Sequence, residues 1–180
     1  MTSSPPDPPE PVVRPAIPAD VPAMHALIGE LAAYEREPHA VVATAGDLHT
    51  ALFSPSPRLH AFVGEVRGEV AGMALWFVSY STWRGRHGIW LEDLVVSGRH
   101  RGRGVGEALL RRLAAECVAR GWARVEWSVL DWNAPAIGFY RGLGASALQE
   151  WTTWRLDRSA LVAAAGPPAP GPRRADQEQA

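Results

Sequence analysis

A segment rich in glycine and arginine, residues 99–106, is the first part of the sequence that could carry chemistry. It reads RHRGRGVG, so Gly102, Gly104 and Gly106 stand at alternate positions. Glycine lets the main chain approach a ligand closely and turn its amides toward it. The residues that follow have helical periodicity, and a helix N-terminus favours phosphate through its free N–H groups and its dipole. We therefore expect a phosphate or pyrophosphate site, with a plain solvated glycine turn as the alternative.

The spacing of these glycines excludes two common nucleotide motifs. Counted from Gly102, the third glycine position of a dinucleotide-binding fingerprint is occupied by Glu107. A P-loop would end in Gly-Lys-Ser/Thr, and the chain contains no lysine.

Two adjacent carboxylates, Glu92 and Asp93, lie inside the apolar run IWLEDLVV, residues 89–96. Such a run is typical of a strand that is buried on both faces, where a charge must be paired, neutralised or used. Alternation along a strand sends neighbouring residues to opposite faces, so at most one carboxylate should face a given cleft unless a β-bulge intervenes. We expect a catalytic or substrate role for at least one of them, and a structural ion pair with an arginine is the alternative.

The elements that must position these groups are alternating strands and helices. Apolar residues recur at helical spacing in two segments, one that begins after Pro18 and one that ends before Gly121. Thr44 with Asp47 resembles a capping box, which indicates the start of another helix. A mixed sheet with helices on its faces is therefore expected. Strands are predicted at residues 12–16, 60–66, 70–80, 87–96, 123–130 and 147–156, with helices from 18, from 44, over 104–120 and over 133–143.

Composition narrows the class of protein. The chain has 180 residues, 47% of them hydrophobic, and a net charge of −1, which fits one globular domain and argues against a general nucleic-acid binder. Cys117 is the single cysteine, so an internal disulfide or a cysteine-based metal cluster is impossible, and a reducing cytoplasm fits. The six histidines show no helical pairing, and no metal site is expected.

Proline is concentrated at both ends of the chain. We expect disordered tails at 1–11 and 166–180 around one folded domain at 12–165. Residues 1–11 do not resemble a signal peptide, and no apolar run approaches the roughly 20 residues of a membrane helix, so no membrane partner is expected.

Several motifs together resemble the GCN5-related N-acetyltransferase (GNAT) superfamily, and within it the diamine (spermidine/spermine) and thialysine N-acetyltransferase group. The segment RGRGVG fits the superfamily's Gln/Arg-x-x-Gly-x-Gly/Ala pattern. The other matching segments follow in the group's order: ELAAYE (30–35), YSTWRG (80–85), LED (91–93), DWNAP (131–135), FY (139–140), GA (144–145) and WRL (154–156).

This resemblance implies a GNAT-type fold, with a mixed and mostly antiparallel sheet flanked by helices and a splayed pair of parallel strands. It also implies acetyl-CoA as co-substrate, held in the opening between those two strands. The implied cofactor-binding residues are Leu94, Val95, Val96, Arg101, Gly102, Arg103, Gly104, Val105, Gly106, Glu107, Asn133, Pro135 and Ala136.

By the same resemblance, Tyr140 is the general acid that protonates the departing thiolate, and Glu92 relays the proton of the amine. Tyr34, Glu35 and Trp83, with Glu92 and Asp93, are implied to form the acceptor site. The resemblance also implies a homodimer.

The acceptor expected from the sequence is a small primary amine, either a thialysine-like amino acid or a diamine, acetylated by direct transfer in a ternary complex. Polyamine-acetylating members carry an aspartate where this chain has Ser81, which favours the smaller amine. The alternatives are a non-catalytic acyl-CoA-binding module and an acetyltransferase for protein N-termini or lysines.

Overall fold

The structure is a computed structural model that describes residues 10–166, in two compact units that divide between Phe139 and Tyr140. The first unit contains a five-stranded sheet whose strands lie side by side in sequence order. The first three pairings are antiparallel and the last is parallel, which confirms the expected mixed, mostly antiparallel sheet. The strands are β1 (Val12–Pro15), β2 (His60–Val66), β3 (Glu69–Ser81), β4 (Arg86–Val96) and β5 (Val125–Glu126).

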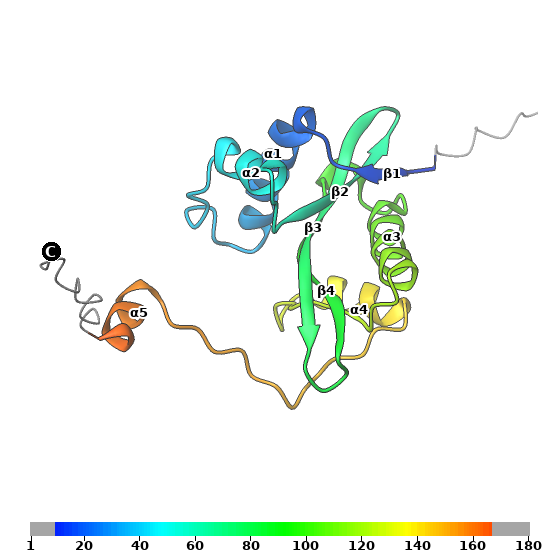
Figure 1. The fold of residues 1–180 in the computed structure, drawn as a ribbon. Coiled ribbons are helices and arrows are strands. Elements are labelled where there is room, and N and C mark those ends of the chain that lie inside the picture. Colours follow the sequence, from blue (N-terminus) through cyan, green and yellow to red (C-terminus); the bar gives the residue numbers. More distant parts are fainter. Residues whose placement is uncertain (1–9, 167–180) are drawn as a thin grey trace, which may run out of the picture. The chain divides into compact units, whose positions relative to one another are not determined.

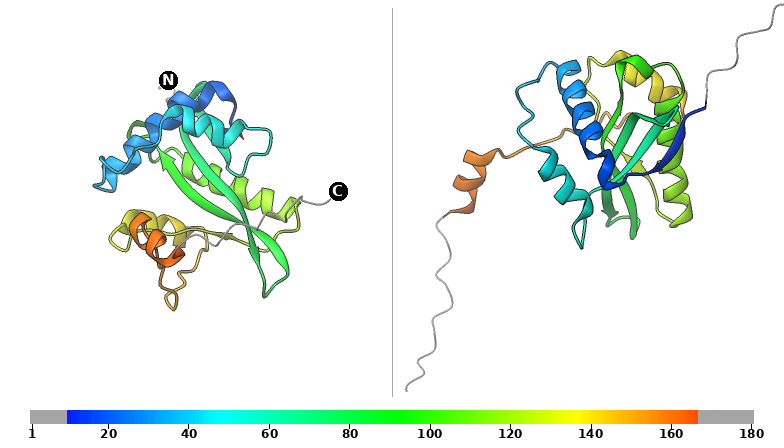
Figure 2. Two further views of the ribbon diagram at one scale, coloured as in Figure 1. Left: turned by 60° about the vertical axis from the view of Figure 1, so that its left-hand side comes forward. Right: turned by 90° about the horizontal axis from the view of Figure 1, so that it is seen from above.

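Helices cover both faces of this sheet (Figure 1). On one face, α1 (Val21–Tyr34) and α2 (Ala45–Phe53) bury Met24, Leu27 and Leu52 against Met73 and other residues of the sheet. On the other face lies α3 (Val105–Ala119), as the view from above in Figure 2 shows. Close packing there depends on small residues in the sheet, because a Cβ atom at position 64 would come within 2.8 Å of the Val105 side chain in α3.

Local signals in the sequence account for the start of most elements. The turn between β2 and β3 consists of Arg67 and Gly68, both with positive φ (56° and 79°), as in a two-residue hairpin turn of the mirror-image type. Thr44 caps α2, since its Oγ1 accepts a hydrogen bond from the amide of Asp47 and its own amide donates to the Asp47 carboxylate. The cap was predicted from the sequence, and the turn lies between the strands predicted at 60–66 and 70–80.

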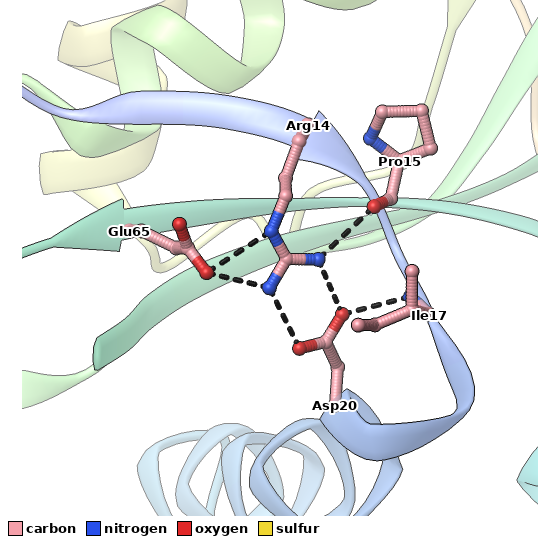
Figure 3. A network of polar contacts seen from close by, with 5 residues as sticks. All are labelled: Arg14, Pro15, Ile17, Asp20 and Glu65. Carbon is pink, nitrogen blue, oxygen red and sulfur yellow. Dashed lines mark hydrogen bonds and ion pairs between the residues drawn. The ribbon is translucent and has the colours of Figure 1, made fainter. Parts of the chain in front are cut away.

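A charged network joins β1 to the short 3-10 helix η1 (Pro18–Asp20) and to β2 (Figure 3). The guanidinium of Arg14 donates to both carboxylate oxygens of the buried Asp20, at 2.6 and 2.8 Å, and also to Glu65. The hydrogen bonds from Arg14 lower the pKa of Asp20 despite its burial. The network therefore fixes the path of the chain from the edge strand into α1.

Two predicted strands differ from the structure. The strand expected at 123–130 is only Val125–Glu126, and the segment expected as a strand at 147–156 is irregular. A strand forms only where a neighbouring strand pairs with its main chain, and in the part of the chain that the structure describes nothing pairs with 147–156. Its side chains Leu148, Trp151 and Trp154 are exposed.

The second unit begins inside α4 (Ala134–Gly142) and includes α5 (Arg158–Ala165), a helix that the sequence did not predict. Asp157 caps α5 by accepting a hydrogen bond from the amide of Ala160. The predicted tails at 1–11 and 166–180 lie almost entirely outside the described residues. No helix within residues 10–166 combines the length and the apolar character needed to cross a membrane.

Candidate active site

The two parallel strands of the sheet separate soon after they meet. Ile89 pairs with Val125 and Trp90 with Glu126, and no further pairing between β4 and β5 is present in residues 10–166. Beyond Trp90, β4 therefore has one edge that no strand covers.

The register of β3 shows which groups of β4 face this open edge. The amide of Ser97 donates to the carbonyl oxygen of Ala71 at 2.9 Å, just past the end of β4. Main-chain groups alternate in direction along an antiparallel strand, so those of Val95 also face β3. Those of Leu94 and Val96 are directed away from β3, toward the open edge. A ligand with amide groups could pair there as an added strand does.

A β-bulge lies at the two carboxylates. Leu75 of β3 lies opposite Asp93, and the register slips by one residue at this point, so Glu92 is an extra residue on β4. Phe77 lies opposite Trp90, and because Leu75 and Phe77 share one face of β3, Trp90 and Asp93 share that face too. The indole Nε1 of Trp90 donates to Glu92 at 3.1 Å. The bulge thus places both carboxylates on the α1 side of the sheet.

These carboxylates form an acidic cluster with Glu35, which directly follows α1. Burial, together with the negative charges of Glu92 and Glu35, raises the pKa of Asp93 to about 6. None of the three forms an ion pair within residues 10–166, so the alternative of a structural pair with an arginine is not present in this part of the chain. A cluster of this kind attracts a cation, and a protonated amine has the required charge.

The glycine-rich loop follows β4 and leads into α3. Gly102 and Gly104 have left-handed φ angles of 73° and 76°, and Gly104 precedes α3 without any side chain that caps the helix. The first amides of α3 therefore remain available to an anion. Glu107, the acidic residue of the first turn, is bound by Arg111 at 2.7 Å. The loop thus fits a phosphate group.

A residue of α1 holds the main chain just before this loop in place. The carboxylate of Glu30 accepts hydrogen bonds from the Ser97 hydroxyl at 3.1 Å and from the amide of Gly98 at 3.2 Å. Gly98 begins the short 3-10 helix η2 (Gly98–His100) that carries the chain to the loop. Glu30 thereby links the helix that carries Tyr34 to the predicted phosphate site.

Tyr34, at the end of α1, connects the predicted acceptor and cofactor residues. Its hydroxyl donates to Oδ1 of Asn133 at 2.9 Å, and the same oxygen accepts from the amide of Ala136 at 3.3 Å. The guanidinium of Arg101 lies over the Tyr34 ring, 4.8 Å from its centre, and the ring of Trp132 lies 5.8 Å away. Tyr34 thus contacts both Arg101 of the glycine-rich loop and Asn133 before α4.

The structure does not bring every predicted residue together. Trp83 lies in the turn after β3, and Ser81 is six residues along β3 from Leu75, which corresponds to about 20 Å. The indole of Trp83, 90% exposed, therefore lies far from Asp93 within this chain. Val95 is buried in the core, and its main-chain groups face β3 rather than the open edge.

The remaining predicted residues fall on two helices. Pro135 and Ala136 lie in the first turn of α4, directly after the buried Asn133, and Val105 and Gly106 open α3. Tyr140 is the seventh residue of α4 and lies in the second compact unit. It has interaction partners of its own.

Sequence reasoning did not assign a role to Glu30, Trp90 or Trp132. Glu30 lies within the quoted segment ELAAYE, which was the available signal, whereas the contacts of Trp90 and Trp132 depend on the register of β4 and on long-range packing.

The arrangement can hold an anion and a cation at two ends of one strand edge. No group of three or more His, Cys, Asp or Glu residues within 10–166 could hold a metal ion. A separate pocket of about 250 Å³, lined by His60, Phe62, Trp76 and Arg112 among others, shares no residue with the groups described above.

Comparison with known proteins gives consistent matches. The family model described as the acetyltransferase (GNAT) family matches residues 25–145. The L-ornithine N5-acetyltransferase NATA1 of Arabidopsis thaliana is 32% identical, over 84% of this chain and 86% of that protein. The thialysine N-epsilon-acetyltransferase of Bos taurus is 36% identical, over 78% of this chain and 88% of that protein.

A solved structure has the same fold. An integron cassette protein from the mobile metagenome of V. cholerae superposes with a TM-score of 0.73 at 22% identity, over 88% of this chain and 99% of that one.

Proposed function

We propose that this chain, which belongs to the acetyltransferase (GNAT) family, transfers an acetyl group from acetyl-CoA to the primary amine of a small amino acid of the thialysine or ornithine kind. As a family member with N-acetyltransferase relatives, the chain is an acyltransferase of small amines. The donor, the direct transfer in a ternary complex and the identity of the acceptor are the parts that we propose.

One observation carries the proposal: the bulge in β4 places two carboxylates directly beside the open strand edge. Asp93 directly precedes Leu94, so the acidic cluster lies next to the first main-chain groups that face the open edge. An ammonium group held by the cluster would therefore lie close to a thioester whose arm pairs with Leu94 and Val96. Proximity of this kind is a large part of the rate enhancement in two-substrate reactions.

The residues that would hold acetyl-CoA divide into two sets. The main-chain groups of Leu94 and Val96 suit the amide-bearing arm, and the loop with the N-terminus of α3 suits the pyrophosphate. Bound acetyl-CoA supplies an activated acetyl thioester. We retain the cofactor residues implied by the resemblance, except that Val95 contributes through packing rather than through its main chain.

The acceptor must lose a proton before it can form the new N–C bond. A primary ammonium with a pKa near 10.4 costs roughly 4.6 kcal/mol to deprotonate at pH 7. Glu92 is exposed and receives a hydrogen bond from Trp90, so it suits a proton relay to solvent. Asp93, Glu92 and Glu35 also attract the charged form of the amine and so raise its local concentration.

As the C–S bond breaks, the leaving thiolate takes up a proton. We assign this donation to the hydroxyl of Tyr140, on the basis of the family resemblance. A positioned acid of this kind contributes typically about 10²–10⁴-fold.

An amino acid is a better candidate acceptor than a long polyamine. Ser81 stands where the polyamine-acetylating members have an aspartate, and it is buried, with its Oγ accepting a hydrogen bond from the amide of Arg84. The names of two relatives, which refer to thialysine and to ornithine, support the same choice.

We also propose that the protein is a cytoplasmic homodimer. The exposed apolar side chains of Leu148, Trp151 and Trp154 would find partners in a second copy. Light scattering coupled to size exclusion would test this by giving twice the mass of the 19.5 kDa chain.

Steady-state kinetics with Asp93→Asn and Glu35→Gln test the acceptor site. Each should raise KM for ornithine or thialysine by about tenfold, since each removes one charge that attracts the ammonium, while the Kd for acetyl-CoA stays unchanged. Unchanged KM values in both variants would place the amine elsewhere.

A further inference from the structure

We propose that the pocket between α3 and the first three strands of the sheet is a binding site for a small aromatic carboxylate. This pocket has a volume of about 250 Å³ and shares no residue with the candidate active site. The inference goes beyond the proposed function and does not depend on it.

Three flat rings form one wall of the pocket. His60 and Trp76 lie opposite one another in the register of β2 and β3, and Phe62 is two residues further along β2, so the three side chains share one face of the sheet. The ring centres of His60 and Phe62 lie 4.6 and 5.9 Å from that of Trp76. Burial and the positive charge of Arg120 lower the pKa of His60, so its imidazole is uncharged at neutral pH. The wall therefore offers an uncharged aromatic surface to a flat ring.

Two arginines of α3 supply positive charge to the pocket. Arg112 and Arg120 lie about two helical turns apart with Glu116 between them, and each donates to one oxygen of Glu116, at 2.8 and 2.6 Å. The guanidinium of Arg112 lies over the Phe62 ring, 4.3 Å from its centre. That of Arg120 lies over the Trp122 ring at 4.9 Å. Both groups are therefore held in place before a ligand binds, and each retains further N–H donors.

The indole of Trp76 adds a donor that has no partner. Trp76 is 4% exposed, and its Nε1–H donates to no acceptor within residues 10–166. A buried donor without a partner is destabilising, and native structures keep few of them. Because Trp76 lines the pocket, an acceptor atom of a bound molecule can satisfy this N–H group.

The donors and acceptors of the pocket decide the charge of its ligand. Arg112, Arg120 and Trp76 all have N–H groups to donate, whereas both oxygens of the Glu116 carboxylate are already bound. A ligand carboxylate supplies acceptor oxygens and forms charge-assisted hydrogen bonds with guanidinium groups. An ammonium group would find no free carboxylate in the part of the lining that the structure describes.

The walls and the volume decide the rest of the ligand. The aromatic wall favours a flat ring over a saturated one. The volume of about 250 Å³ is below the roughly 300–1,000 Å³ of pockets for drug-sized ligands, so it suits a molecule of about one or two rings. An aromatic carboxylate of this size meets both conditions.

Benzoate is the probe for the test, and the indole N–H resonance of Trp76 in a proton–nitrogen correlation spectrum is the readout. Trp76→Phe identifies this resonance by its disappearance. We expect benzoate to shift the resonance and to bind the full-length chain with a Kd of about 0.1–1 mM. Cyclohexanecarboxylate keeps the charge without the flat ring, and benzyl alcohol keeps the ring without the charge, so each should bind at least about fivefold more weakly.

Substitutions in α3 test the role of the two arginines. Arg112→Gln and Arg120→Gln should each raise the Kd of benzoate about five- to tenfold, because each removes a charge-assisted hydrogen bond. Arg111→Gln is the matched control, since Arg111 also binds a glutamate one helical turn away, Glu107, but does not line the pocket. This control should leave the Kd of benzoate unchanged.

Arg103→Gln separates this pocket from the glycine-rich loop, in which Arg103 is an exposed residue. Benzoate binding that responds to Arg103→Gln but not to Arg112→Gln would lie at the loop, and this result would contradict the proposal. A Trp76 resonance that benzoate does not move, or equal Kd values for benzoate and cyclohexanecarboxylate, would also overturn it.

Discussion

Replacement of Asp93 by asparagine should stabilise the protein at neutral pH and not at acid pH. Burial and the charges of Glu92 and Glu35 raise the pKa of this carboxyl from 3.8 to about 6. This difference in pKa corresponds to roughly 3 kcal/mol by which the fold disfavours the ionised form. Structural relaxation reduces this figure, so we expect a gain of about 1–3 kcal/mol from Asp93→Asn at pH 7.5.

Proton linkage determines how the stability gain of Asp93→Asn depends on pH. Between the unfolded pKa of 3.8 and the folded pKa of about 6, the native state binds more protons than the unfolded state. The contribution of Asp93 to stability therefore falls as the pH rises through this range. The advantage of Asp93→Asn should be full at pH 7.5 and should disappear near pH 4.

Urea denaturation at pH 7.5 and pH 4 measures this difference directly. Asp47→Asn is a suitable control, because hydrogen bonds from Thr44 lower the pKa of Asp47 from its ordinary value of 3.8, and any effect of that substitution should be nearly the same at pH 7.5 and at pH 4. An Asp93→Asn variant that is no more stable than wild type at pH 7.5 would refute the electrostatic account of the cluster.

Three further substitutions test other parts of the structure. Gly104→Ala should lower acetyl-CoA affinity at least tenfold and stability by about 1–2 kcal/mol, because its φ is +76°, and calorimetry and thermal unfolding would show both. Tyr140→Phe should lower kcat about 10²–10³-fold with an unchanged Kd for acetyl-CoA, and a near wild-type kcat would exclude the acid role. Arg14→Met should cost about 2–3 kcal/mol, since the buried carboxylate of Asp20 loses its partner, whereas Arg111→Met at an exposed pair should change stability by less than about 0.5 kcal/mol in the same denaturation assay.

The sequence predicts those features that depend on local periodicity and turn chemistry. The hairpin at Arg67 and Gly68, the cap at Thr44 and the helix after the glycine loop all follow from a few adjacent residues. The mixed sheet follows from the order of strands and helices along the chain, although the sixth predicted strand, at 147–156, does not form.

Features that depend on pairing between distant segments could not be predicted. The two carboxylates at 92 and 93 share a face because the register of β3 slips at Leu75, and no local pattern shows that slip. The hydrogen bond between Tyr34 and Asn133 joins residues 99 apart in the chain. The alternation in 147–156 indicates a strand, but the strand also requires a partner, which the sequence of the segment does not provide.

The most direct test of the proposed function is a CoA-release assay with acetyl-CoA and a panel of amines: thialysine, ornithine, lysine, putrescine and spermidine. Mass spectrometry of the acetylated product would identify the acceptor atom. We predict that kcat/KM is highest for thialysine or ornithine, lower for putrescine and lowest for spermidine. The proposed function would be contradicted if none of these amines caused release of CoA, or if spermidine were preferred over both amino acids.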